Sequence, residues 1–347
     1  MYKEINPFQR KKASIIDLLQ RRSLKYAKYR FQWHLARKYA ILPSKPLNID
    51  VELSDACNLR CSMCVHGMDG LPNVGHMDDA LAVRLINEAA QIGIPAIKFN
   101  WRGEPGLHPR LIDYIKLAKK LGFVDIQINT NLVSLNSEKT KELALSGIHR
   151  IIVSCDGATK DTYESIRIGS SFERLRRNLE IINNIKKEQN LIYPKVRIQF
   201  VKQISNVHEV DLFFSEFKHL ADDLRVSEVS NRGADGVLSV GDQIAVGRRR
   251  CEQPWQRIII SKDGIYHPCC NDWDQTYPLG NTKSDSIMSA WNSQQSKSLR
   301  EANLLAELDS HPLCKNCFVP ESYIWQDVSD KKASDDEVNA FGRRRVT

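Results

Sequence analysis

Short apolar, β-rich runs alternate with helical patterns along the chain from residue 47 to about residue 230. The runs cover residues 47–53, 96–101, 124–130, 150–155, 196–201 and 224–229. Between them, apolar residues recur at spacings of three and four, as in Leu81, Leu85, Ile86 and Ala89. Such spacing is typical of helices with one buried face. The alternation predicts six βα units that share a parallel sheet.

Six βα units are two fewer than a complete TIM barrel contains, so we expect an α/β fold of the partial (β/α)6 TIM-like type. The chemistry of such barrels gathers at the carboxyl ends of the strands. Cys57, Gly103, Asn131 and Asp156 each lie just past one of the predicted strands. One shared site could therefore collect all four residues.

The pattern divides the chain into four segments. We expect a basic helical extension over residues 1–46, the partial barrel over 47–230, a small C-terminal domain over 231–328 and a polar, disordered tail over 329–347. The small domain shows a hairpin pattern through Lys262-Asp263-Gly264 and one helical pattern over 287–299. It is too small for a core of its own, and a bound metal cluster would supply the missing stabilisation.

The net charge of +8 arises in the first segment. Residues 1–46 contain twelve Lys or Arg against Glu4 and Asp17, so the remaining chain has a net charge of −2. The basic arm could contact an anionic membrane surface or a phosphorylated substrate, although a solvated helix packed on the barrel is the more common role of such a charge run. No apolar run reaches the roughly 18 residues of a membrane helix. We therefore expect a cytoplasmic protein.

Nine cysteines in a protein without an export signal are better interpreted as metal ligands or reactive thiols than as disulfides. Cys57, Cys61 and Cys64 follow the spacing CxxxCxxC directly after a predicted strand. Three thiolates on one turn can hold three irons of a cubane cluster and leave the fourth iron open for a small molecule. A zinc site would need a fourth ligand, and His66 follows Cys64 too closely for that role.

This motif and the segments that follow it resemble the radical S-adenosylmethionine (SAM) superfamily over about residues 47–320. In that family the open iron of a [4Fe–4S] cluster binds the amino and carboxylate groups of SAM. Reductive cleavage then gives a 5′-deoxyadenosyl radical, which abstracts a hydrogen atom from the substrate. Arg102-Gly103-Glu104-Pro105 resembles the family's Gly-Gly-Glu-Pro motif, with Arg102 in place of the first glycine. The resemblance implies that Gly103, Glu104 and Pro105 hold the SAM ammonium group.

Other segments resemble the family in the same chain order. The Asn129-Thr130-Asn131 segment is similar to one near the SAM ribose, and Ser154-Cys155-Asp156-Gly157 is similar to one at the end of the fourth strand. The SAM-binding residues that the resemblance implies here are Asn129, Asn131, Ser154, Asp156, Arg167 near the SAM carboxylate and Met63 beside the adenine.

A second set of thiols lies late in the chain at Cys251, Cys269, Cys314 and Cys317. This set resembles the SPASM and twitch subgroup, and it implies one auxiliary [4Fe–4S] cluster. A zinc ribbon with the same four ligands is the alternative. Cys270 is then a spare thiol, either structural or a hydrogen-atom donor to a substrate radical.

The resemblance implies a radical SAM oxidoreductase or epimerase that acts on a sugar, aminocyclitol or glycosyl-type small molecule, similar to 2-deoxy-scyllo-inosamine dehydrogenase. Arg232, just past the sixth predicted strand, could contact a substrate hydroxyl group, although a surface loop position is the more common role of such a residue. A flavodoxin or ferredoxin would supply the electron. Peptide modification, nucleic-acid modification and a non-catalytic, zinc-stabilised binding protein are the alternatives.

Overall fold

The computed structural model describes residues 23–64, 66–67, 70–71, 73–228, 250–315, 317 and 326–327. Within these ranges, one sheet has the strand order β11-β10-β9-β1-β3-β4-β5-β7-β8-β12. The six predicted strands are its centre: β1 (Asn48–Val51), β3 (Ala96–Phe99), β4 (Asp125–Thr130), β5 (Arg150–Ser154), β7 (Lys195–Lys202) and β8 (Asp223–Glu228). Each pairs in parallel with the next. The predicted fold class is confirmed.

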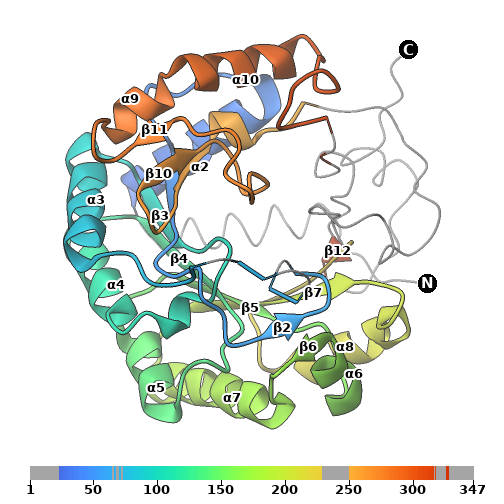
Figure 1. The fold of residues 1–347 in the computed structure, drawn as a ribbon. Coiled ribbons are helices and arrows are strands. Elements are labelled where there is room, and N and C mark those ends of the chain that lie inside the picture. The colour runs from blue at the N-terminus through green and yellow to red at the C-terminus, as the bar shows by residue number, and fades with distance from the viewer. Residues whose placement is uncertain are drawn as a thin grey trace.

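Helices form the outer layer around the curved sheet (Figure 1). They are α3 (Asp79–Ile92), α4 (Leu111–Lys120), α5 (Ser137–Leu145), α6 (Lys160–Ile166), α7 (Phe172–Glu188) and α8 (Val210–Phe217). Local sequence fixes their ends. The Asp78 side chain caps α3 by accepting a hydrogen bond from Leu81 N, and Gly93 ends it with a φ of 77°, the left-handed region that glycine tolerates best.

The strands alternate between an apolar and a polar face. Val196, Ile198 and Phe200 of β7 belong to the main core beneath the helices, and Arg197 and Gln199 between them point to the opposite, concave side. The other central strands show the same alternation. A complete barrel usually fills its interior with branched apolar side chains, whereas the lumen of this partial barrel is polar.

The C-terminal segment extends the sheet on the other side of β1. Strand β9 (Arg257–Ile260) pairs in parallel with β1, and the predicted hairpin follows as β10 (Ile265–His267) and then β11 (Gly280–Asn281). Ile258, Ile260 and Tyr266 join the main core of the barrel. The hairpin therefore supplies a seventh parallel strand, which the local sequence pattern does not predict.

The prediction of a single helix over residues 287–299 is wrong. The structure has two helices, α9 (Ile287–Trp291) and α10 (Gln294–Leu304). The Ser293 side chain accepts a hydrogen bond from Ser296 N and so starts the second helix. A local cap has overridden an apolar pattern that continues through the break.

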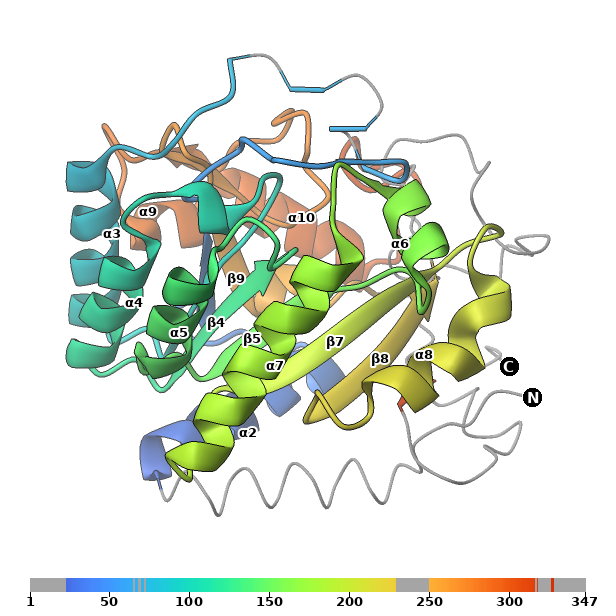
Figure 2. The same cartoon turned by 90° about the horizontal axis from the view of Figure 1, so that it is seen from below.

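Helix α2 (Leu24–Tyr39) lies under the amino ends of the strands (Figure 2). Its buried Tyr26 and Tyr29 pack with Leu47, Ala96 and Trp255. This part of the basic arm therefore packs on the barrel, while residues 1–22 lie outside the described part of the chain, as does the tail predicted over 329–347. No helix among the described residues is long and apolar enough to cross a membrane.

Short elements complete the chain. They are β2 (Arg60–Cys61), which pairs with β6 (Arg167–Ile168), β12 (Gln326–Asp327), which pairs with β8, and the 3-10 turns η1 (Pro105–Leu107), η2 (Val207–Glu209) and η3 (Gln253–Trp255).

Candidate active site

Cys57, Cys61 and Cys64 lie on one turn beyond the carboxyl end of β1. The antiparallel pair β2–β6 anchors this turn, with Cys61 opposite Arg167, and Cys64 N donates to the Cys61 carbonyl oxygen at 3.0 Å. Burial raises the pKa of the Cys57 thiol to about 12, and the Glu104 carboxylate and the other two thiols add to the rise. A thiolate is stable here only beside positive charge, which bound iron would supply.

The predicted Gly-Gly-Glu-Pro-like motif packs directly against this turn. Glu104 N donates to the Ala56 carbonyl oxygen at 2.8 Å. A Cβ atom on Gly103 would lie 2.4 Å from the Ser54 carbonyl oxygen and 2.5 Å from that of Ala56. Only glycine allows this approach. Arg102 does not have a positive φ, so the position of the family's first glycine accepts a side chain here.

Glu104 is buried, and its carboxylate already has four protein donors. Oε1 accepts from Thr130 Oγ1 at 2.7 Å, Gly106 N at 2.9 Å and Ser134 Oγ at 3.2 Å. Among the described residues, Oε2 accepts from Asn131 N alone, at 2.7 Å. The carboxylate is therefore fixed in orientation, and Oε2 can accept one more donor, such as the ammonium group of a ligand.

The next predicted segment contributes two asparagines with different surroundings. Asn131 binds protein through both of its side-chain polar atoms: Oδ1 accepts from Val133 N and Ser134 N, and Nδ2 donates to Asn58 Oδ1 at 2.9 Å. Asn129 Oδ1 is buried and has no hydrogen-bond partner among the described residues. An orphaned buried oxygen is uncommon in native proteins. Asn129 is therefore the better ligand contact, and Asn131 joins the motif loop to the cysteine turn.

Asp156 and Arg167 form a buried ion pair behind the cysteine turn. Arg167 Nη2 lies 2.6 Å from Asp156 Oδ2, and its Nη1 donates to Cys61 Sγ at 3.8 Å. Asp156 Oδ1 accepts from Val201 N at 2.7 Å. Asp156 therefore positions Arg167, whose buried Nε–H has no acceptor among the described residues.

The remaining predicted contacts lie in the same region. Ser154 ends β5, Pro105 begins η1, and Met63 packs against the main core. Orphaned polar groups, a glycine cradle and three soft ligands on one turn are features that fit SAM on an open iron site.

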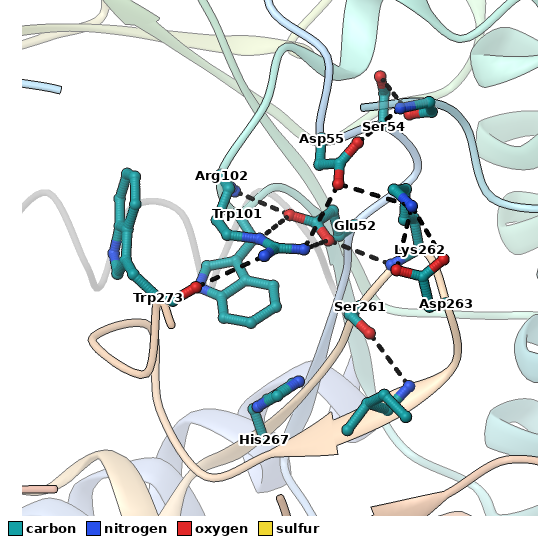
Figure 3. A network of polar contacts seen from close by, with 12 residues as sticks. Glu52, Ser54, Asp55, Trp101, Arg102, Ser261, Lys262, Asp263, His267 and Trp273 are labelled. Carbon is teal, nitrogen blue, oxygen red and sulfur yellow. Dashed lines mark hydrogen bonds and ion pairs between the residues drawn. The ribbon is translucent and has the colours of Figure 1, made fainter. Parts of the chain in front are cut away.

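Arg102 ties the motif to the C-terminal segment (Figure 3). Its Nε and Nη2 donate to Glu52 Oε1 and Oε2 at 2.9 and 2.8 Å, and its Nη1 donates to the Trp273 carbonyl oxygen at 3.4 Å. Lys262 N also donates to Glu52, at 3.1 Å. A buried ion pair thus joins the ends of β1 and β3 to the turn after β9.

The second thiol set lines one small cavity between α10 and the C-terminal loop. Cys251, Cys269, Cys314 and Cys317 share its wall with Pro254, Leu299, Asn303, Leu308 and Leu313. Burial raises the pKa values of Cys251 and Cys269, and the neighbouring thiols add to the rise. This four-thiol arrangement is the one that the ligand prediction requires.

No three His, Cys, Asp or Glu side chains in the described ranges converge tightly enough to hold a single metal ion. A cubane binds each thiolate through a separate iron and needs wider sulfur spacing than one ion does. The absence of a single-ion site among the described residues is therefore compatible with cysteine sets that hold cubane clusters.

Cys270 lies apart from the cavity wall. Its carbonyl oxygen accepts from Trp101 Nε1 at 3.1 Å. Burial lowers the pKa of Arg257, whereas Asp50 and then Cys270 raise it, so Cys270 lies within electrostatic reach of this lumen residue. Arg232, the other predicted catalytic residue, lies outside the described residues.

Comparison with known proteins agrees with this geometry. A model of the radical SAM superfamily matches residues 51–193, and a model of an iron–sulfur cluster-binding domain, SPASM, matches residues 251–318. Residues 51–193 therefore form a radical SAM domain, and residues 251–318 form a SPASM domain. The two domains together imply SAM and iron–sulfur clusters as cofactors.

Two relatives match about half of this chain. A probable GTP 3′,8-cyclase of Saccharolobus solfataricus is 28% identical over 187 residues, which are 53% of this chain and 56% of that protein. The GTP 3′,8-cyclase of Clostridium perfringens is 27% identical over 190 residues, 52% and 58% of the two chains. The match thus spans little more than half of these relatives.

Solved radical SAM structures share the fold. BtrN in complex with AdoMet and 2-DOIA has a TM-score of 0.55 at 22% identity, covering 78% of this chain and 92% of BtrN. Streptococcus suis SuiB bound to the precursor peptide SuiA has a TM-score of 0.61 at 14% identity, covering 85% and 72% of the two chains. For anSMEcpe with bound AdoMet the values are 0.59 and 15%, with coverages of 80% and 89%.

The charged residues of the lumen are not among the predicted site residues. Asp50, Lys98 and Arg197 stand on the concave faces of β1, β3 and β7, and Arg257 and Arg225 stand on β9 and β8. The sequence does contain a pattern that could have revealed them, because each of these charged residues alternates with buried apolar residues along its strand. A charged residue at the inward position of a barrel strand indicates a polar lumen.

Proposed function

We propose that this chain is a radical SAM enzyme that cleaves SAM reductively and removes a hydrogen atom from a small molecule. The observation that carries the proposal is the cysteine turn joined to the Gly103–Glu104 cradle at the carboxyl ends of the strands, above a polar lumen. When bound, the iron–sulfur cluster and SAM supply the electron and the hydrogen-abstracting radical. The side chains of the site would bind and orient these groups and the substrate, and would exclude water.

We assign the roles as follows. Cys57, Cys61 and Cys64 would hold three irons of the SAM-binding cluster, and the free lone pair of Glu104 Oε2 would accept from the SAM ammonium group. Asn129 and Arg167 would offer an acceptor and a donor to the same ligand, and Ser154 and Met63 would line its site. Cys251, Cys269, Cys314 and Cys317 would hold one auxiliary [4Fe–4S] cluster in the C-terminal part, which we place at 231–328.

The substrate is best explained as a sugar, aminocyclitol or glycosyl-type molecule that is oxidised or epimerised. The fold similarity to BtrN and the single auxiliary thiol set support this proposal. Epimerisation would need a hydrogen-atom donor, and Cys270, which interacts electrostatically with Lys98 and Arg257 of the lumen, could act as one. Oxidation would pass a second electron to the auxiliary cluster. A flavodoxin or ferredoxin would provide the first electron.

The experiment is an anaerobic assay of 5′-deoxyadenosine with SAM and dithionite after reconstitution with iron and sulfide. The variants are a triple Cys57/Cys61/Cys64→Ala protein and Cys155→Ala. Cys155 is a buried thiol that donates to the Gly157 carbonyl oxygen at 3.2 Å and belongs to neither set. We expect product from the wild type and from Cys155→Ala, and none from the triple variant. Equal product from all three proteins would refute the proposal.

A further inference from the structure

The inward faces of the described barrel strands have more cationic than acidic side chains. The inward positions of the described strands hold six cations, Lys98, Arg150, Lys195, Arg197, Arg225 and Arg257, and three acids, Asp50, Asp125 and Asp223. In register, Asp50, Lys98, Gln127 and Arg150 stand side by side on four neighbouring strands. Positive charge therefore collects on the face that a substrate would meet.

Two of the acids, Asp50 and Asp223, form ion pairs with three of these cations. Arg257 Nη1 pairs with Asp50 at 3.0 Å. Arg197 and Arg225 share one oxygen, Asp223 Oδ2, through their Nε atoms at 2.6 and 3.0 Å. Within the described ranges, Arg197 donates no other hydrogen bond. Its two terminal NH2 groups are therefore available to a ligand.

Lys98 is the second available donor. The described residues give its ammonium group no hydrogen bond and no ion pair. Burial lowers the pKa of Lys98 to about 8, with Asp50 opposing the effect and Arg257 and Arg197 contributing to it. Burial and then the charge of Arg225 lower the pKa of Arg197 to about 9. Burial and neighbouring cations oppose the charged form of both groups more than Asp50 and Asp223 favour it, and an anionic ligand would offset that cost.

We propose that the barrel lumen binds an anionic group of the substrate, a phosphate or a carboxylate, between Lys98 and Arg197. The inference rests on the proposed function, because it names the substrate class for the same lumen. Lys98 precedes Arg102 of the motif by four residues, at most about 13 Å of extended chain. An anion held at Lys98 would leave the rest of a small substrate between this anchor and the cysteine turn.

Isothermal titration calorimetry on the reconstituted full chain tests the proposal. The probes are inorganic phosphate, malonate and glycerol, at an ionic strength held constant with sodium chloride because free ions screen such contacts. We expect phosphate or malonate to bind and glycerol not to bind. Loss of one charge-assisted contact in Lys98→Met or Arg197→Gln should weaken binding about tenfold, and Lys98→Arg should restore part of it.

Lys116→Met is the matched control, because Lys116 is exposed on α4, outside the barrel. Its affinity for the anion should equal that of the wild type. Binding of neither anion, or equal binding by Lys98→Met and the wild type, would overturn the inference. SAM cleavage is measured on the same wild-type preparation. A protein that cleaves SAM but binds no anion contradicts only the anion site, whereas a protein that does not cleave SAM contradicts the proposed function.

Discussion

At the scale of single residues, Lys98 should reduce the stability of the protein even though we propose that it binds an anionic group of the substrate. Its folded-state pKa of about 8 lies below the ordinary value of 10.5, so the unfolded chain binds more protons between these values. Stability therefore rises as pH increases from 8 to 10.5, and the penalty is fully present below pH 8. Asp50 on β1, Arg257 on β9, Arg197 on β7 and the Cys270 thiol surround the ammonium group.

We predict that Lys98→Met raises the free energy of unfolding by about 1–2 kcal/mol at pH 7, after allowance for partial exposure of the group. The gain should disappear near pH 10.5. Anaerobic thermal melting across this pH range, beside Lys116→Met, measures the effect. A Lys98→Met protein that melts below the wild type at pH 7 would show that the ammonium group has a partner that stabilises it.

Arg102 gives the second residue-scale prediction. Its partner Glu52 has a side-chain exposure of 0%, so Arg102→Met would leave a buried carboxylate without its ion pair. We expect a loss of about 3–5 kcal/mol. The matched control is Arg110→Met, which breaks a surface pair with Asp79 and should change stability by less than about 1 kcal/mol. Equal melting temperatures for the two variants would show that the Arg102 network contributes little.

At the scale of elements, the close approach of the motif to the loop after β1 depends on Gly103. We predict that Gly103→Ala separates the two and lowers 5′-deoxyadenosine formation at least about tenfold, because small misplacements of reacting groups reduce rates strongly. Gly75→Ala is the control, since a Cβ atom there meets nothing within 4 Å. Unchanged activity in Gly103→Ala would mean that the two loops need not touch for SAM cleavage.

The sequence predicted the elements whose information is local. The six βα units and the hairpin turn at Gly264 follow from apolar spacing and turn chemistry. The pairing of β9 with β1 joins residues about 200 positions apart, and no local pattern contains that contact. The break at Ser293 was missed because one serine cap outweighs the apolar spacing around it.

The residues of the candidate site also fall into those that local sequence predicts and those that it does not. The two cysteine sets and the Gly103–Glu104 segment are visible as motifs. The use of Asn131 and Asp156 to hold neighbouring loops is visible only once the loops are placed together.

At the scale of the whole molecule, one core supports both thiol sets. Ile258, Ile260 and Tyr266 of the C-terminal segment pack with Ile49 and Val51 of β1, and Arg102 joins the same parts by charge. The cysteine turn and the four-thiol cavity are therefore held on one sheet, with the polar lumen inside it. We propose that each thiol set holds its own iron–sulfur cluster.

The most direct test counts iron per chain after anaerobic reconstitution. It uses the wild type, the Cys57/Cys61/Cys64→Ala variant and a Cys251/Cys269/Cys314/Cys317→Ala variant. Two separate clusters predict about eight irons in the wild type and about four in each variant. About four irons in the wild type that persist in either variant, or zinc in place of iron, would contradict the account.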